Sequence, residues 1–140
     1  MDEIAPDSVP ARLALVVGRL NRRLALAQGG LSHAPLMALA QVAKRDSVRL
    51  SELAQLERVS APAITRVVAE LEIRGLVTRT VDADDRRAFR IQITAAGRDA
   101  ILVARAARAQ VVADLLVGLE PEQVAAIEAA LPALEKTIGL

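Results

Sequence analysis

The sequence predicts a mainly α-helical protein that carries one two-stranded β-hairpin. Three observations favour this fold class. Apolar residues recur at helical spacing over most of the 140 residues, alanine and leucine are frequent, and strand-like alternation is confined to residues 76–93. One domain is the default at this length.

The first helix is expected to run from Ser8 or Pro10 to about Ala27. Gly29 and Gly30 are expected to end it. Its apolar residues fall on one face, at positions i, i+3, i+4, i+7 and i+11: Leu13, Val16, Val17, Leu20 and Leu24.

Two shorter helices are expected next. Ser32 is a good N-cap for one that has Pro35 in its first turn and ends near Arg45. Another is expected to begin after residues 48–50, with Ser51 as its cap.

A fourth helix follows after only a short break at Arg58 and Val59. Ser60 is its expected N-cap, residues 61–74 form it, and Gly75 ends it. Two short helices joined by a tight turn form a helix-turn-helix unit.

The apolar period then changes from 3.6 to 2. Residues 76–81 are rich in Val and Thr, and in residues 88–93 apolar side chains alternate with Arg90 and Gln92. Arg79 interrupts the pattern, because it shares a parity with apolar neighbours. The six residues between the strands, 82–87, are mostly charged, so the hairpin has a charged tip.

The chain is expected to close with two helices. Thr94 caps a long one that reaches about Val117, and Gly118 breaks it. The last helix follows Pro121, and Pro132 is expected to kink it or end it early.

The composition excludes several classes of site. The chain has no cysteine, so disulfides, cysteine metal sites and thiol switches are excluded, and its one histidine, His33, rules out a histidine-rich metal site. Without a Cys nucleophile, a phosphate-binding GxxxxGK[ST] loop or a plausible histidine-centred site, we expect no enzyme and no cofactor. We expect a structural role for His33 beside a helix cap rather than effector sensing.

No targeting or membrane segment is visible. Asp2 and Glu3 stand where a signal peptide would have a basic region. The longest stretch without charge, Leu24 to Ala43, contains Gly, Ser, His and Pro, so it is expected to be a loop between two helices. A cytoplasmic protein is expected.

The net charge of +1 conceals a separation along the chain. Residues 44–98 carry 11 basic and 8 acidic side chains, whereas residues 99–140 carry 3 basic and 6 acidic ones. The basic middle is either an ordinary solvated surface or a footprint for an anionic partner.

The fourth helix combines with the hairpin in a way that suits DNA. A helical wheel turns Ile64, Val67, Val68 and Leu71 toward the core. The opposite face is small apart from one hydroxyl and one guanidinium, and consists of Pro62, Thr65, Arg66 and Ala69. Such a face fits a major groove, where arginine pairs with guanine and small apolar groups contact the thymine methyl. Ser60 and the first amides of the helix suit a phosphate. The alternative for Arg66 is a solvated or internally paired arginine.

Several motifs together resemble the MarR family of bacterial transcriptional regulators. They are Ser51-Glu52-Leu53-Ala54, Ser60-Ala61-Pro62-Ala63-Ile64-Thr65-Arg66, Leu71-Glu72-Ile73-Arg74-Gly75-Leu76-Val77, Asp82 through Arg87, and Ile93-Thr94-Ala95-Ala96-Gly97. The resemblance implies a winged helix-turn-helix in residues 31–98, with a two-stranded β-wing. It also implies dimerisation helices in residues 1–30 and 99–140.

The same resemblance implies a homodimer on double-stranded DNA with a pseudo-palindromic operator. Asp85 would orient Arg87 in the minor groove, and Arg86 would either contact phosphate or balance the acids of the tip. Such regulators are usually repressors released by a small lipophilic or aromatic-acid effector, whose site in this chain the sequence leaves unknown. The alternative is a winged helix that works without effector, as an architectural or protein-interaction module.

Overall fold

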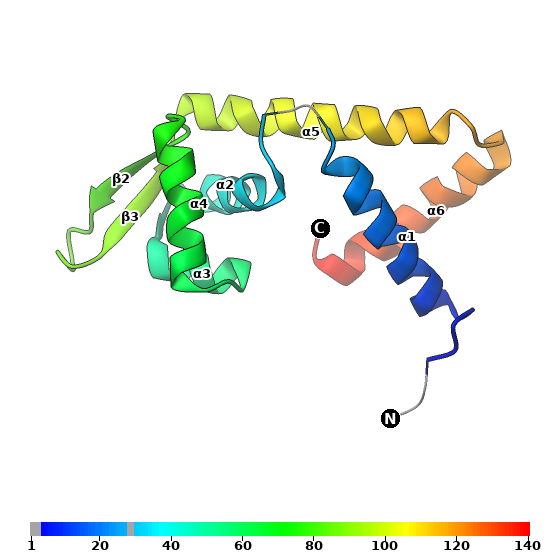
Figure 1. The fold of residues 1–140 in the computed structure, drawn as a ribbon, viewed down its shortest axis with the longest axis horizontal. Helices are drawn as coiled ribbons and strands as arrows, with labels where there is room; N and C mark the ends of the chain where they lie inside the picture. The colour runs from blue at the N-terminus through cyan, green and yellow to red at the C-terminus, as the bar shows by residue number, and fades with distance from the viewer. Residues whose placement is uncertain (1–3, 28–29) are drawn as a thin grey trace.

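The computed structural model describes residues 4–27 and 30–140. In chain order the elements are α1 (Val9–Leu24), α2 (His33–Arg45), β1 (Ser47–Arg49), α3 (Leu50–Glu57), α4 (Ala61–Ile73), β2 (Val77–Val81), β3 (Phe89–Ile93), α5 (Ala95–Leu116) and α6 (Pro121–Ile138). The long helix α5 spans the molecule, with α2, α3, α4 and the sheet at one end and α1 and α6 at the other (Figure 1). The predicted mainly helical fold with one hairpin is confirmed. Asp2, Glu3 and Gly29, on which two predictions rested, lie outside the described residues.

The sheet has one strand more than the sequence predicted. Its order is β1-β3-β2, and both pairings are antiparallel. The hairpin of β2 and β3 is the predicted wing, with Val77 opposite Ile93 and Val81 opposite Phe89. The strand β1 has only three residues, too few to show alternation, but it places Val48 fully buried against Ile91. The wing is thereby anchored to the helices before it.

Helix starts follow capping chemistry with two exceptions. The hydroxyls of Ser8, Ser60 and Thr94 accept backbone N–H groups three residues ahead, which satisfies a donor that the first turn leaves open. Ser32 precedes α2 but its side chain makes no cap bond. The prediction that Ser51 caps the next helix is wrong, because α3 begins at Leu50, directly after β1.

The core lies among α2, α3, α4, the sheet and the first half of α5. It is entirely aliphatic, and its buried apolar residues run from Leu31 to Ala104. Phe89, the one aromatic residue, is 37% exposed, so it does not fill the core. At Gly97 a methyl group would overlap the carbonyl oxygen of Leu76, so glycine allows α5 to pack closely on the start of the wing.

The terminal helices differ from this core. Neither α1 nor α6 contains a buried residue. The expectation that Pro132 would end the last helix early is wrong, since α6 continues to Ile138. Proline removes a single N–H donor, and on an exposed helix water reaches the carbonyl that loses its partner. No helix in the described residues is both long and apolar enough to cross a membrane.

Candidate nucleic-acid interface

The helix α4 presents one buried and one exposed face, as its wheel predicts. Ile64, Val68 and Leu71 are at most 2% exposed and hold the helix on the core. The four residues of the opposite side, which we call the outer face of α4, are all exposed: Pro62, Thr65, Arg66 and Ala69. The core therefore fixes which side chains α4 offers to a partner.

The polar groups of this face differ in how firmly they are held. The hydroxyl of Thr65 donates to the carbonyl oxygen of Ala61 at 2.7 Å, so it remains an acceptor for a partner. Ser60 accepts the N–H of Ala63 at 3.3 Å at the start of the helix. Arg66 is exposed and makes no ion pair within the described residues. Its guanidinium is thus available as a fork of donors.

The tip of the wing is ordered by carboxylates that bind the backbone. Oδ1 of Asp82 accepts the N–H of Asp84 at 2.8 Å, and Oδ1 of Asp85 accepts the N–H of Arg87 at 3.0 Å. Asp85 therefore contacts the backbone of Arg87, whereas the resemblance to the family implied that it orients the side chain. Arg86 and Arg87 are both exposed and project from this fixed turn.

Asp82 anchors the wing through a network that the sequence did not reveal. It is 1% exposed, and its Oδ2 accepts Nε of Arg49 at 2.7 Å and Nη1 of Arg90 at 3.3 Å. Nε of Arg90 donates in turn to Oγ of Ser47 at 2.7 Å. Asp82 pairs with arginines of β1 and β3 rather than with those of the tip. Only the register of three strands brings these residues together.

This network sets the charge of its members. The hydrogen bond from Arg49, followed by the backbone N–H of Asp84, holds the pKa of Asp82 well below its ordinary value of 3.8. The same bond raises the pKa of Arg49. Because Asp82 is ionised and neutralised by two cations, it does not present an open negative charge at the wing.

A small hollow lies between the wing and the start of α3. It has a volume of about 240 Å³ and is lined by Arg49, Leu50, Ser51, Arg87, Ala88 and Phe89. Two arginines and one serine thus line a hollow beside the wing, and the guanidinium of Arg49 is also bound to Asp82. Together with the outer face of α4, they form a surface rich in donors for anionic oxygens.

Comparison with known proteins shows which family has this arrangement of helices and wing. The model of the MarR family matches residues 31–89, which include α2, the helix-turn-helix, the first strand of the wing and its tip, up to the first residue of β3. An uncharacterized HTH-type transcriptional regulator of Mycobacterium leprae is 32% identical over 113 residues, 79% of each chain. The chain belongs to the MarR family. As a MarR family member it is a DNA-binding transcriptional regulator with a winged helix-turn-helix, and its relatives are named as regulators rather than enzymes.

Two further proteins show how far the likeness extends. The transcriptional repressor MdtR of Bacillus subtilis is 34% identical over 68 residues, 49% of this chain and 44% of MdtR. The wild-type MarR of E. coli in its apo form has the same fold, with a TM-score of 0.78 at 21% identity over 95% of this chain and 98% of that one. The common fold therefore includes the terminal helices as well as the winged helix.

The other polar residues singled out from the sequence lie away from this surface. His33 is exposed in the first turn of α2 and borders an apolar hollow with Val17, Leu20 and Leu24 of α1. Over the described ranges, no three His, Asp or Glu side chains gather as ligands for a metal ion.

Proposed function

We propose that this chain is a homodimeric repressor that reads a pseudo-palindromic operator. In each copy α4 lies in the major groove and the tip of the wing in the adjacent minor groove. The observation that carries the proposal is the outer face of α4, which is small and exposed and is followed in the chain by a wing with two exposed arginines at its tip. The repressor name of MdtR supports repression rather than activation.

Each site residue has a distinct role in this complex. Arg66 pairs with guanine, Thr65 accepts from a base or sits on a phosphate, and Pro62 and Ala69 contact thymine methyl groups. Ser60 and the first amides of α4 hold a phosphate. In the wing, the groups that contact DNA or shape its tip are Asp85, Arg86 and Arg87. Arg87 enters the minor groove, Arg86 contacts the backbone, and Asp85 keeps the turn in shape.

The terminal helices join two copies. Residues 1–30 and 99–140 form the dimerisation region, and residues 31–98 form the DNA-binding region. Exposed apolar side chains in α1 and α6 support this division, because monomeric proteins seldom leave so many uncovered. They include Leu13, Val16, Val17, Leu20, Ile127, Leu131 and Leu134.

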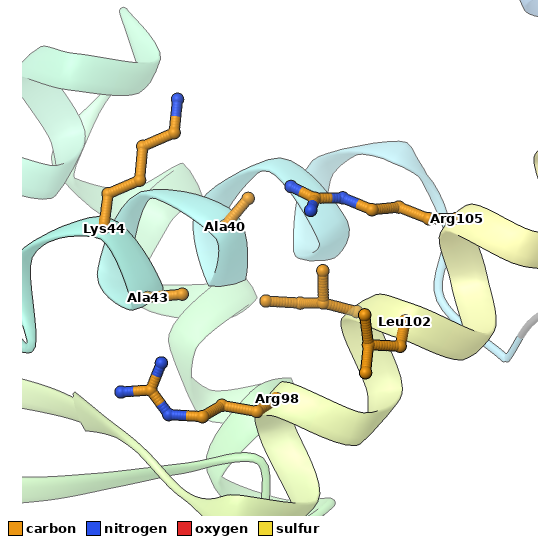
Figure 2. A pocket seen from close by; sticks show the side chains of 7 residues that line it. Ala40, Ala43, Lys44, Arg98, Leu102 and Arg105 are labelled. Carbon is orange, nitrogen blue, oxygen red and sulfur yellow. The ribbon is translucent and has the colours of Figure 1, made fainter.

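A small organic acid acts as effector in the groove between α2 and α5. Ala40 and Ala43 of α2 face Leu102 of α5 across an apolar floor, and the groove has a volume of about 350 Å³ (Figure 2). Figure 2 shows Arg98 and Arg105 reaching from α5 toward α2 on either side of Leu102. Arg98 pairs with Asp46 at 3.3 Å, whereas Arg105 makes no ion pair within the described residues. An apolar floor beside the guanidinium of Arg105 fits an aromatic carboxylate.

The proposal also limits where and how the protein works. A regulator of this class meets its operator in the cytoplasm. We assign it no catalytic role, because no nucleophile and base stand together in the donor surface described above.

Selection from a random DNA pool tests the DNA-binding part. Bound fragments are expected to contain two half-sites with centres about one helical turn, roughly 34–36 Å, apart. Arg66→Ala is expected to weaken binding to the selected duplex by about 1–3 kcal/mol and to relax base preference at one position. Arg87→Ala is expected to lower the slope of log K against log salt by about 1.

Arg12→Ala is the matched control, because it removes one arginine from α1 at the far end of the molecule from the wing (Figure 1). Equal losses for operator and random duplex in Arg66→Ala would make Arg66 a phosphate contact instead. Full affinity of Arg87→Ala across the salt series would sink the minor-groove assignment.

Competition between DNA and small acids tests the effector. Benzoate is expected to lower the affinity for the selected duplex, whereas benzyl alcohol, its uncharged analogue, is not. Arg105→Ala is expected to remove the response to benzoate and leave DNA affinity intact. If a panel of aromatic and aliphatic acids leaves DNA binding unchanged, the effector-independent architectural module becomes the better description.

A further inference from the structure

Arg79 is a charged residue on the face of the wing that continues the core. In the register of the hairpin it lies opposite Ile91, which is fully buried, and it shares a face with Val77, which is 2% exposed. Its own position is partly buried. An arginine on the apolar side of a strand requires a reason, because its charge is costly to bury without a partner.

The structure holds Arg79 in place without neutralising it. Its guanidinium carbon lies 4.7 Å from the centre of the Phe89 ring, within the range of a cation–π contact. Its Nε is buried and has no hydrogen-bond partner in residues 4–27 and 30–140, and it takes part in none of the ion pairs found there. By contrast, Arg49 and Arg90 are both paired with Asp82. Arg79 is therefore an oriented cation that lacks an anion.

The placement of Arg79 indicates which anion it meets. The helix α4 leads into β2 through the short turn at Gly75, so β2, which carries Arg79, joins α4 to the tip of the wing. The major and minor grooves of a duplex are separated by one sugar-phosphate strand. A protein with α4 in one groove and the wing tip in the next must straddle that strand, and β2, which joins the two, then crosses over its phosphates.

We propose that Arg79 binds a backbone phosphate of the strand that separates the two grooves. The inference rests on the proposed docking of α4 and the wing. A phosphate is favoured over a base because the side chain is held back against Phe89, whereas a base contact needs a side chain that protrudes into a groove.

Two substitutions separate charge from packing. Arg79→Met keeps a flexible stem over Phe89 and removes the charge, and Arg79→Lys keeps the charge. Binding is measured over a salt series on a duplex that the wild-type chain selects from a random pool, and the thermal midpoint of each variant is recorded. Arg79→Met is expected to lose about ten- to a hundredfold in affinity at low salt and to lower the salt slope by about 1. Arg79→Lys is expected to retain the slope. Arg12→Met controls for net charge, and sedimentation checks that this variant, which lies on α1, still dimerises.

Methylphosphonate substitution in the DNA locates the contact. Each phosphate of the strand between the grooves is made neutral in turn. The wild-type chain is expected to lose affinity at any phosphate held by Ser60 or Arg86 and at one more, the phosphate of Arg79. At that position Arg79→Met is expected to show no further loss. This comparison remains informative if Arg79→Met is less stable, because Arg79→Lys must respond to the same phosphate as the wild type.

The results of these experiments distinguish a failure of the Arg79 contact from a failure of the proposed docking. An unchanged slope and affinity in Arg79→Met, together with a loss in Arg87→Ala, overturns the role of Arg79 and leaves the docking of the wing in place. If neither variant changes the slope, the proposed docking itself fails. A loss in Arg79→Met that is matched by no phosphate position makes Arg79 a structural residue, which also overturns the inference.

Discussion

The winged helix and the terminal helices contain similar apolar residues but differ in how far they bury them. Leu39 of α2 is fully buried, whereas Leu131 of α6 is 45% exposed although both lie on helices rich in alanine and leucine. The elements of the winged helix, together with the first half of α5, bury their apolar residues in one core. The helices α1 and α6 contain no buried residue. Helical propensity alone therefore does not say whether a segment is self-sufficient. The packing partner decides, and for the terminal helices we propose that it is a second copy.

The difference has a consequence for DNA recognition. The proposed DNA-binding surface stands on the closed core, which includes Ile101 and Ala104 of α5, so the elements that carry it are held in place before any partner arrives. The terminal helices are free to set the distance between two such surfaces. A substitution that disrupts dimerisation should therefore leave the fold of the winged helix intact enough for its stability to be measured.

The largest effect is expected from a charge on the exposed apolar stripe of α6. Leu131→Asp should weaken dimerisation by roughly 3–6 kcal/mol, since in a two-fold interface each lost side chain counts twice at about 1.5–3 kcal/mol. Sedimentation equilibrium over a concentration series measures the shift. Ala129→Asp places the same charge on the opposite side of α6 and should leave the dimer intact. Equal dissociation of both variants would contradict the proposed interface.

A cavity in the winged helix should act on folding instead. Leu39→Ala is expected to lower the free energy of unfolding by about 2–5 kcal/mol, because the fully buried site cannot collapse around the lost atoms. Urea unfolding measures this change. Ile138→Ala, at a side chain that is 71% exposed, should cost about 0.5 kcal/mol or less. A similar cost at both positions would show that α6 belongs to the folded core.

The two parts also differ in how far the sequence predicted them. The burial of Ile64, Val68 and Leu71 followed from helical spacing, and the hairpin followed from a change of period, because both are local patterns. The network at Asp82 did not follow, since it depends on the pairing of β1 with β3, 43 positions apart at Ser47 and Arg90. The strand β1 itself was too short to carry a pattern.

The exposure of α1 and the length of α6 could not be predicted from the sequence for a different reason. Pro132 was expected to kink α6 or end it early, and α6 continues past it to Ile138; the rule for an early end assumes that the lost hydrogen bond is not replaced. Similarly, the sequence showed an apolar stripe on α1 without showing whether the stripe was covered. Both questions depend on solvent and partners rather than on local spacing.

A smaller effect is expected at Asp82, which ties the wing to the self-contained part. Asp82→Asn should destabilise the protein at neutral pH, but less than Leu39→Ala, because the side chains of Arg49 and Arg90 are 39% and 37% exposed and can rehydrate. The pKa of Asp82 is lowered by folding, so its contribution is present above the ordinary value near 3.8 and is lost as the pH falls through the folded value. The difference between variant and wild type should therefore shrink in acid.

Urea unfolding at several pH values between about 7 and 2 measures this difference. Asp84→Asn is the matched control, because it removes the same charge from an exposed side chain of the same loop. If both variants are equally stable at neutral pH, the network at Asp82 does not hold the wing.

The smallest effect is expected from the helix caps, where the chain offers a matched pair. The hydroxyl of Ser60 accepts a backbone N–H of α4, and Ser32 stands at the same position before α2 without such a bond. Ser60→Ala should therefore cost about 1 kcal/mol of unfolding free energy, and Ser32→Ala should cost clearly less. Only Ser60→Ala should also weaken DNA binding, because the N-terminus of α4 is the proposed binding site for a backbone phosphate. Losses of equal size in both variants would mean that the hydrogen bond of the cap does not determine the stability of these helices.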